Sequence, residues 1–257
     1  MFTVEQRDAV RDRVLRLADE DARIVAGAVV GSLALGNGDR YSDLDVTFAV
    51  GDGAAVLDVL DDWTRRLGDD AGAVQLVDLA RDPTVYRVLL LPGALQLDLS
   101  MTPAASFRPG GPRFRLLFGE TAAPVPVSSP APPGNLAIPT PAVPRDILGW
   151  GVVYALHARA CIERGRPWQA EHYVAALRDH GLALACIRED CNAVQARGYD
   201  DLSPESLARF GGTHIGGHEP AALRSALDAA VRALLHEGAE AGLAHAGAVA
   251  ERLAELH

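Results

Sequence analysis

Alternation of apolar and polar positions predicts strands in several segments of the first hundred residues. The alternation is clearest around Leu44, Val46 and Phe48. These residues are two positions apart, a spacing that places them on one face of a strand. The Pro92-Gly93 pair is a tight-turn signal between two apolar runs, so these runs should pair as an antiparallel hairpin. The expected strands cover residues 24–30, 43–50, 73–79, 84–91 and 94–100, with a last short strand at 114–120.

Apolar residues at helical spacing predict helices over residues 3–21 and 54–67. Together with the strands, they predict a mixed α/β domain over residues 1–121. Prolines crowd the segment that follows, and because proline at this density forbids helix, residues 122–144 are predicted to be a linker.

Beyond the linker, the sequence is rich in Ala, Leu, Arg and Glu and predicts an α-helical domain over residues 145–257. The expected fold class is therefore α+β, with an N-terminal mixed-sheet domain followed by an all-α helical bundle. The expected helices cover 145–164, 168–196, 204–209 and 219–256, the last with Gly238, Gly242 or Gly247 as points of interruption.

Composition is that of an ordinary globular protein. The chain has 257 residues, 49% hydrophobic and 23% charged, which suits two unequal domains. The N-terminus lacks the layout of a signal peptide and no apolar run reaches the roughly 20 residues of a membrane helix, so a cytoplasmic protein is expected. The net charge of −10 argues against binding to a nucleic-acid backbone. Three cysteines form no C-x-x-C pair and are interpreted as buried thiols: Cys161, Cys186 and Cys191.

Three acidic residues stand out against this background. Asp43 and Asp45 lie two residues apart in a strand, so their side chains share a face and can share a cation. The segment around Asp98 alternates in the same way and puts this residue on the polar face of its strand. If the two strands are neighbours, three carboxylates converge and need a cation. Hard divalent ions with oxygen ligands, Mg²⁺ first, are the natural occupants, and two of them can stabilise the attacking and leaving oxygens of an in-line displacement.

A Gly-Ser turn precedes these acids. Gly31 and Ser32 should end a strand and open a helix, where backbone N–H groups can meet triphosphate oxygens. Glycine also lets a phosphate approach the backbone closely. The sequence therefore predicts a site for a metal ion and a triphosphate.

With these residues, positions 22–101 resemble the nucleotidyltransferase superfamily, which includes polymerase-β-like catalytic domains and small-molecule (antibiotic) adenylyltransferases. The pattern of that superfamily is Gly-Ser, a nearby Gly, Asp-x-Asp, and a third acid on a later strand. This sequence matches it with Gly31, Ser32, Gly36, Ser42, Asp43, Asp45 and Asp98.

The resemblance implies transfer of a nucleoside monophosphate, usually AMP from ATP, to an acceptor hydroxyl with release of pyrophosphate. It implies that Asp43, Asp45 and Asp98 bind metal, and that the nucleotide is held by Gly31, Ser32, Gly36 and Ser42. It also implies that the helical domain closes over a small acceptor, such as an aminoglycoside or lincosamide antibiotic. A homodimer is one arrangement left open.

The catalytic base has two candidates. Glu171 lies in the helix that opens after residues 165–167 and is one of them, since some antibiotic nucleotidyltransferases supply a base from the helical domain. Asp98 is the other, as in polymerase-like members. Trp150, Trp168 and Tyr173 are candidates for an acceptor pocket, although aromatic residues at helical spacing more often form core.

Two further functions share the same residues. One is a nucleotide-binding regulatory or antitoxin-like protein that binds or AMPylates a protein partner. The other is RNA polymerisation or tRNA end-addition, which the acidic balance of the chain disfavours.

Overall fold

The computed structural model of the chain describes residues 1–36, 38–123 and 143–254. Most of the expected linker, residues 124–142, lies outside this part. Within it, the N-terminal half forms one mixed sheet with the strand order β3-β4-β5-β2-β1-β6. The strands are β1 (Ile24–Val30), β2 (Leu44–Val50), β3 (Val74–Arg81), β4 (Thr84–Leu91), β5 (Leu95–Pro103) and β6 (Phe114–Phe118).

The pairing of β5 decides where the chemistry lies. It pairs antiparallel with β4 across the short 3-10 turn η1 (Pro92–Ala94), which confirms the expected hairpin. On its other edge it pairs parallel with β2, in a register that sets Asp98 beside Asp45. The two acidic strands are therefore neighbours at the middle of the sheet.

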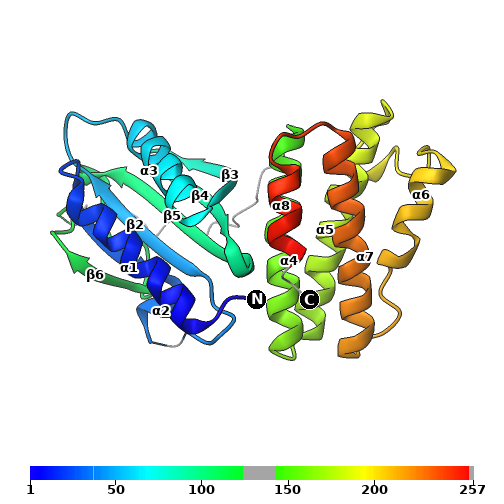
Figure 1. Cartoon of the computed structure of the whole chain (residues 1–257), viewed down its shortest axis with the longest axis horizontal. Helices are drawn as coiled ribbons and strands as arrows, with labels where there is room; N and C mark the ends of the chain where they lie inside the picture. The colour runs from blue at the N-terminus through cyan, green and yellow to red at the C-terminus, as the bar shows by residue number, and fades with distance from the viewer. Residues whose placement is uncertain (37, 124–142, 255–257) are drawn as a thin grey trace, which may run out of the picture.

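Two helices cover one face of this sheet, α1 (Val4–Glu20) and α3 (Val56–Ala71) (Figure 1). Both were expected from helical spacing. A capping box between Thr3 and Gln6 fixes the start of α1. Trp63 of α3 packs on Phe48 of β2 with ring centroids 5.1 Å apart, and both side chains are fully buried. The apolar side of β2 thus faces the core, which leaves its polar side for the acids.

The C-terminal half is helical, so the fold class is α+β as expected. Its longer helices are α4 (Pro144–Glu163), α5 (Pro167–Arg188), α6 (Pro204–Phe210), α7 (Pro220–Glu240) and α8 (Ala246–Leu253). The segment expected as one helix over 219–256 is interrupted between α7 and α8, around Gly242. None of the described helices has the length and apolarity to cross a membrane.

The prediction that the second of these helices reaches residue 196 is wrong. Helix α5 ends at Arg188, and Asp190 turns the chain with a φ of 57°. The N–H of Cys191 then donates to the carbonyl of Cys186 at 2.8 Å, which closes the helix end. A glycine at this left-handed position would have signalled the helix end in the sequence, but the position is occupied by Asp190.

The sheet and the helices share an apolar boundary, formed by α4 on β3 and by α8 near η1 (Figure 1). Gly149 of α4 lies so close to the backbone of Leu76 that an added Cβ would clash with its carbonyl. Side chains from β3 and β4 join the helical core, among them Leu76 and Leu90. This contact sets the start of α5 and the end of α4 beside the acidic strands.

Candidate metal and nucleotide site

The three acids converge in the structure. Asp43 immediately precedes β2, Asp45 lies within it, and Asp98 is the parallel partner of Asp45 on β5. One carboxylate oxygen from each can be chosen so that all three lie within 4.8 Å of one another. The side chains are neither fully buried nor fully exposed. The predicted convergence of the three carboxylates is thus confirmed.

The triad has no ion-pair partner in the described part of the protein, although the charge of Asp43 acts on Arg164 and His157. Within the described residues, no Arg or His forms an ion pair with Asp43, Asp45 or Asp98. Burial, followed by the charges of Asp43 and Asp98, raises the pKa of Asp45 to about 8. Burial and the charge of Asp43 also raise the pKa of Asp98, against the hydrogen bond that Gln96 Nε2 donates to it at 2.9 Å.

Such a triad fits a divalent metal ion. Asp45 and Asp98 hydrogen-bond each other, which requires a proton between two groups that are normally ionised at neutral pH. A bound divalent cation would remove the need for that proton, since it supplies the missing positive charge at the same oxygens. Carboxylate oxygens are the ligands that hard cations such as Mg²⁺ prefer.

Gly31 makes room for the triad. Its φ is +69°, a left-handed conformation that other residues rarely adopt, and a Cβ here would overlap Oδ2 of Asp45. The need for glycine therefore comes from the packing of Asp45 as well as from any approach of a phosphate. The helix expected after Gly31 is a single turn, α2 (Gly31–Ala34), with Ser32 on it.

The other two predicted nucleotide residues have different surroundings. Gly36 lies just beyond α2, where its N–H donates to the carbonyl of Leu33 at 3.2 Å. Ser42 is buried and donates its hydroxyl to Asp39 at 3.0 Å, so it also braces the loop before β2.

A cavity lies over this loop, here called the loop-side cavity. Two of the three triad carboxylates, those of Asp43 and Asp45, line this cavity together with three arginines and the Gly-Ser turn. Its lining comprises Gly31, Ser32, Leu35, Asp39, Ser42, Asp43, Asp45, Arg113, Arg164 and Arg166. Positive side chains beside carboxylates that can hold a metal are what a triphosphate requires.

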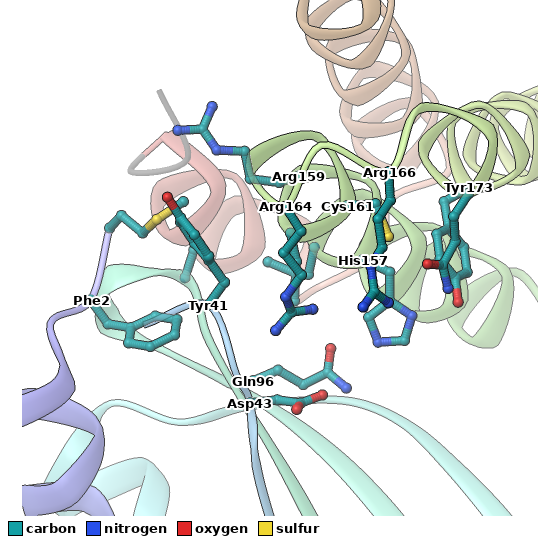
Figure 2. A pocket seen from close by; sticks show the side chains of 15 residues that line it. Phe2, Tyr41, Asp43, Gln96, His157, Arg159, Cys161, Arg164, Arg166 and Tyr173 are labelled. Carbon is teal, nitrogen blue, oxygen red and sulfur yellow. The ribbon is translucent and has the colours of Figure 1, made fainter. Parts of the chain in front are cut away.

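A second cavity opens between the sheet and the helices, here called the interdomain cavity. It shares Asp43, Arg164 and Arg166 with the loop-side cavity, so the two adjoin. Figure 2 shows Arg164 and His157 reaching from the helical side toward Asp43 and Gln96 on the sheet side. A molecule in this cavity would lie next to the metal triad.

Arg164, at the C-terminal end of α4, ties the two halves together beside the site. Its Nε and Nη2 each donate to a carboxylate oxygen of Asp39 at 2.8 Å. This pairing lowers the pKa of Asp39 and raises that of Arg164. Tyr41 adds a hydroxyl contact to Glu163 at 3.3 Å.

Two polar residues of the interdomain cavity were missed as site residues. Gln96 is only 4% exposed, and its Oε1 has no hydrogen-bond partner among the described residues. His157 packs edge-on against Tyr173, with ring centroids 5.1 Å apart, and burial lowers its pKa. The alternation around Asp98 placed Gln96 on the same polar face, and that was the available signal. His157 lies in an apolar helix and gave none.

The predicted base Glu171 lies apart from both cavities. It is on α5, and its Oε2 is 3.0 Å from Nε2 of His218, which packs against the largely exposed Trp168. It lines neither the loop-side nor the interdomain cavity. Of the three aromatic candidates, Tyr173 lines the interdomain cavity, whereas Trp150 packs against the helical core.

Comparisons with known proteins add little to this geometry. No family model matches the chain, and no curated protein matches its sequence. Among solved structures, the chain is similar to an aminoglycoside 6-adenyltransferase from Bacillus subtilis, with 12% identity over 99% of this chain and 92% of that one and a TM-score of 0.30. A similarity at this level does not support a conclusion about function, which depends on the site itself.

Proposed function

We propose that this chain is a Mg²⁺-dependent nucleotidyltransferase that moves a nucleoside monophosphate, AMP from ATP in the first instance, to a hydroxyl group of a small acceptor. The observation that carries the proposal is the convergence of Asp43, Asp45 and Asp98 without a basic partner, beside a cavity lined by Gly31 and Ser32. A structural cluster of three acids would be paired with arginine; a site for a metal-bound triphosphate would not.

The sheet domain supplies the donor side. Asp43, Asp45 and Asp98 are the proposed ligands of two Mg²⁺ ions. When bound, these ions would polarise the phosphoryl oxygens and neutralise charge on the attacking and leaving oxygens, an effect of several kcal/mol. Ser32 and Arg113 face the loop-side cavity and would bind the β- and γ-phosphates.

The reaction itself is one in-line displacement at the α-phosphorus. The acceptor hydroxyl oxygen forms a bond to the α-phosphorus, the bond from that phosphorus to the bridging oxygen breaks, and pyrophosphate leaves. We assign the hydroxyl proton to Asp98, because this carboxylate adjoins Gln96 at the floor of the interdomain cavity. Neither carboxylate lines a cavity, but Asp98 belongs to the triad and accepts from Gln96 of the interdomain cavity, whereas Glu171 pairs with His218, and this argues for Asp98 as the base.

The helical domain supplies the acceptor side of the proposal. We place the donor domain at residues 1–121 and the acceptor domain at 145–257, with the interdomain cavity as the place where the acceptor hydroxyl meets the donor. An aminoglycoside or a lincosamide antibiotic is the acceptor that the resemblance suggests, so both belong in any acceptor panel.

The test is transfer of label from α-labelled nucleoside triphosphates in the presence of Mg²⁺ and an acceptor panel. Combined Asp43→Asn and Asp45→Asn should lower the rate by about 1,000-fold or more, since the metal contribution of several kcal/mol is lost. The matched control combines Asp19→Asn with Asp69→Asn, two exposed acids with the same total change of charge.

Unchanged turnover in the Asp43/Asp45 variant would refute the mechanism. Label that enters a co-purified protein while no small molecule is modified would instead support the AMPylating alternative.

A further inference from the structure

The charges that line the interdomain cavity are mostly positive. Arg159, Arg164 and Arg166 line it from the helical side, and Figure 2 shows Arg164 and Arg166 reaching toward the sheet, whereas Arg159 turns away from Asp43 and Gln96. Among the described residues of this lining, Asp43 is the only carboxylate, and it belongs to the metal triad. The lining of this cavity therefore has no carboxylate, other than the one in the triad, that could pair with an ammonium group of an acceptor.

The three guanidinium groups differ in how far they are already engaged. Arg164 is held by Asp39 through two hydrogen bonds. Arg159 is 3.5 Å from Glu163, but Glu163 also pairs with Arg224 at 3.0 Å, so one carboxylate serves two cations. The guanidinium group of Arg166 makes no hydrogen bond or ion pair within the part of the chain that the structure describes, although the backbone N–H of this residue donates to the carbonyl of Cys161 at 2.9 Å.

A cation without a partner at the wall of a cavity favours an anionic ligand. A charge-assisted hydrogen bond between guanidinium and phosphate or carboxylate is among the strongest polar contacts in proteins. A polycationic amino sugar would have to give up the hydration of its ammonium groups beside three arginines, with no carboxylate to replace that hydration. The lining thus disfavours the amino sugars that the resemblance suggested.

The floor of the cavity adds a requirement for a hydrogen-bond donor. Gln96 is held in place because its Nε2 donates to Asp98, and this leaves Oε1 without a partner. A buried carbonyl oxygen that lacks a partner costs about 1–3 kcal/mol. An acceptor hydroxyl bound there would satisfy it and would lie beside the triad.

We propose that the acceptor is a small hydroxyl compound that also carries a phosphate or carboxylate group, with the anion at Arg166 and a hydroxyl at Gln96. This inference rests on the proposed function and narrows its substrate class. The transfer step is the displacement given above, and the anionic group takes no part in it.

Matched probes test the proposal by binding and by transfer. Glucose 6-phosphate, glucuronate, glucose and glucosamine share one hexose ring and differ mainly in charge, and kanamycin is added as a larger polycationic aminoglycoside. All five are titrated calorimetrically into the protein with Mg²⁺ and a non-hydrolysable ATP analogue. The phosphate or the carboxylate probe should bind about 10- to 100-fold more tightly than glucose, and which of the two binds better identifies the anion. In the transfer assay the same probe should show the higher kcat/KM.

Arg166→Gln should remove this preference, whether or not it also raises the KM for ATP through the loop-side cavity that Arg166 also lines, whereas Arg232→Gln, an exposed arginine on α7, should change neither the preference nor the KM. Tighter binding of kanamycin, equal binding of all probes, no binding of either anionic probe, or a rise in the ATP KM alone in Arg166→Gln would each overturn the proposal. Failure of the proposed function would look different: no metal-dependent binding of the ATP analogue and no transfer to any probe.

Discussion

Two sets of poorly exposed carboxylates, one in each half of the molecule, differ in whether the protein supplies their counter-charge. In the helical half, Glu237 of α7 is 1% exposed and accepts hydrogen bonds from Nε and Nη2 of Arg188 at 2.9 and 3.3 Å. In the sheet half, Asp45 and Asp98 lie side by side with no basic residue paired to them among the described residues. The protein thus neutralises Glu237 itself and leaves Asp45 and Asp98 without an ion-pair partner among the described residues.

The presence or absence of an ion-pair partner distinguishes Glu237, which supports the fold, from Asp45 and Asp98, which we propose to bind a ligand. Removing one partner of a buried ion pair strongly destabilises a protein, so Arg188 and Glu237 belong to the architecture of the helical half. Like charges held together without a counter-charge weaken the fold instead, and are retained at sites that use them. Changes to either region should therefore have opposite effects on stability.

Arg188→Met should cause the largest loss of stability, because it leaves the carboxylate of Glu237 buried without its partner. The free energy of unfolding should fall by about 3–5 kcal/mol. Urea unfolding measures it, with Arg178→Met as a control because Arg178 pairs with the exposed Asp179. The control should lose about 1 kcal/mol or less. Equal losses in the two variants would contradict the distinction.

Gly31→Ala should damage stability and metal binding together. The left-handed φ and the overlap with Asp45 should cost about 1–3 kcal/mol, and the displaced carboxylate should weaken Mn²⁺ binding. Gly36→Ala is the matched control, since Gly36 has a φ of +71° but open space around its Cβ position. It should lose stability and keep its Mn²⁺ affinity. Unchanged affinity in Gly31→Ala would refute the coupling to Asp45.

Asp45→Asn should stabilise the metal-free protein at alkaline pH. The pKa of Asp45 is raised in the folded state, so its favourable contribution is complete below the ordinary Asp value near 3.9 and is lost as the pH rises through about 8. In EDTA, the melting temperature of the wild type should fall relative to that of Asp45→Asn between pH 5 and pH 8.5. The difference should reach about 5 °C. A constant difference in melting temperature between the two proteins across this pH range would contradict the raised pKa.

Arg164→Gln should have the smallest effect on stability. Its partner Asp39 is nearly half exposed, so the pair should contribute about 1 kcal/mol or less to the free energy of unfolding. Because the pair ties the end of α4 to the loop before β2, limited proteolysis near residue 39 should nonetheless become faster. A loss well above that amount would mean that the contact supports the fold and not only the closure of the site.

The acidic side of the site could be predicted from the sequence because strands have a simple period. Asp98 was found by alternation alone, and the parallel register with Asp45 confirmed it. The basic side could not be found in this way. Arg164 and Arg166 lie between α4 and α5, where residue spacing does not indicate which way a side chain points. Only the packing of α4 on β3 brings these arginines over the acids.

Two other features depended on three-dimensional contacts. The role of Gly31 in making room for Asp45 becomes visible only when the turn and β2 are folded together. Glu171 was selected for its position near the start of a helix, but its carboxylate contacts His218 and lines neither cavity. Local spacing cannot tell which side of a helix in a bundle faces a cavity.

The central claim is that Asp43, Asp45 and Asp98 hold a divalent cation. Calorimetric titration with Mn²⁺ at pH 7, repeated in buffers of different ionisation enthalpy, tests it most directly. The account predicts saturable binding that releases a proton, because the proton between Asp45 and Asp98 must leave, and it predicts no such binding in the Asp43→Asn, Asp45→Asn variant. Saturable Mn²⁺ binding that persists in this variant, or none in the wild type, would contradict it.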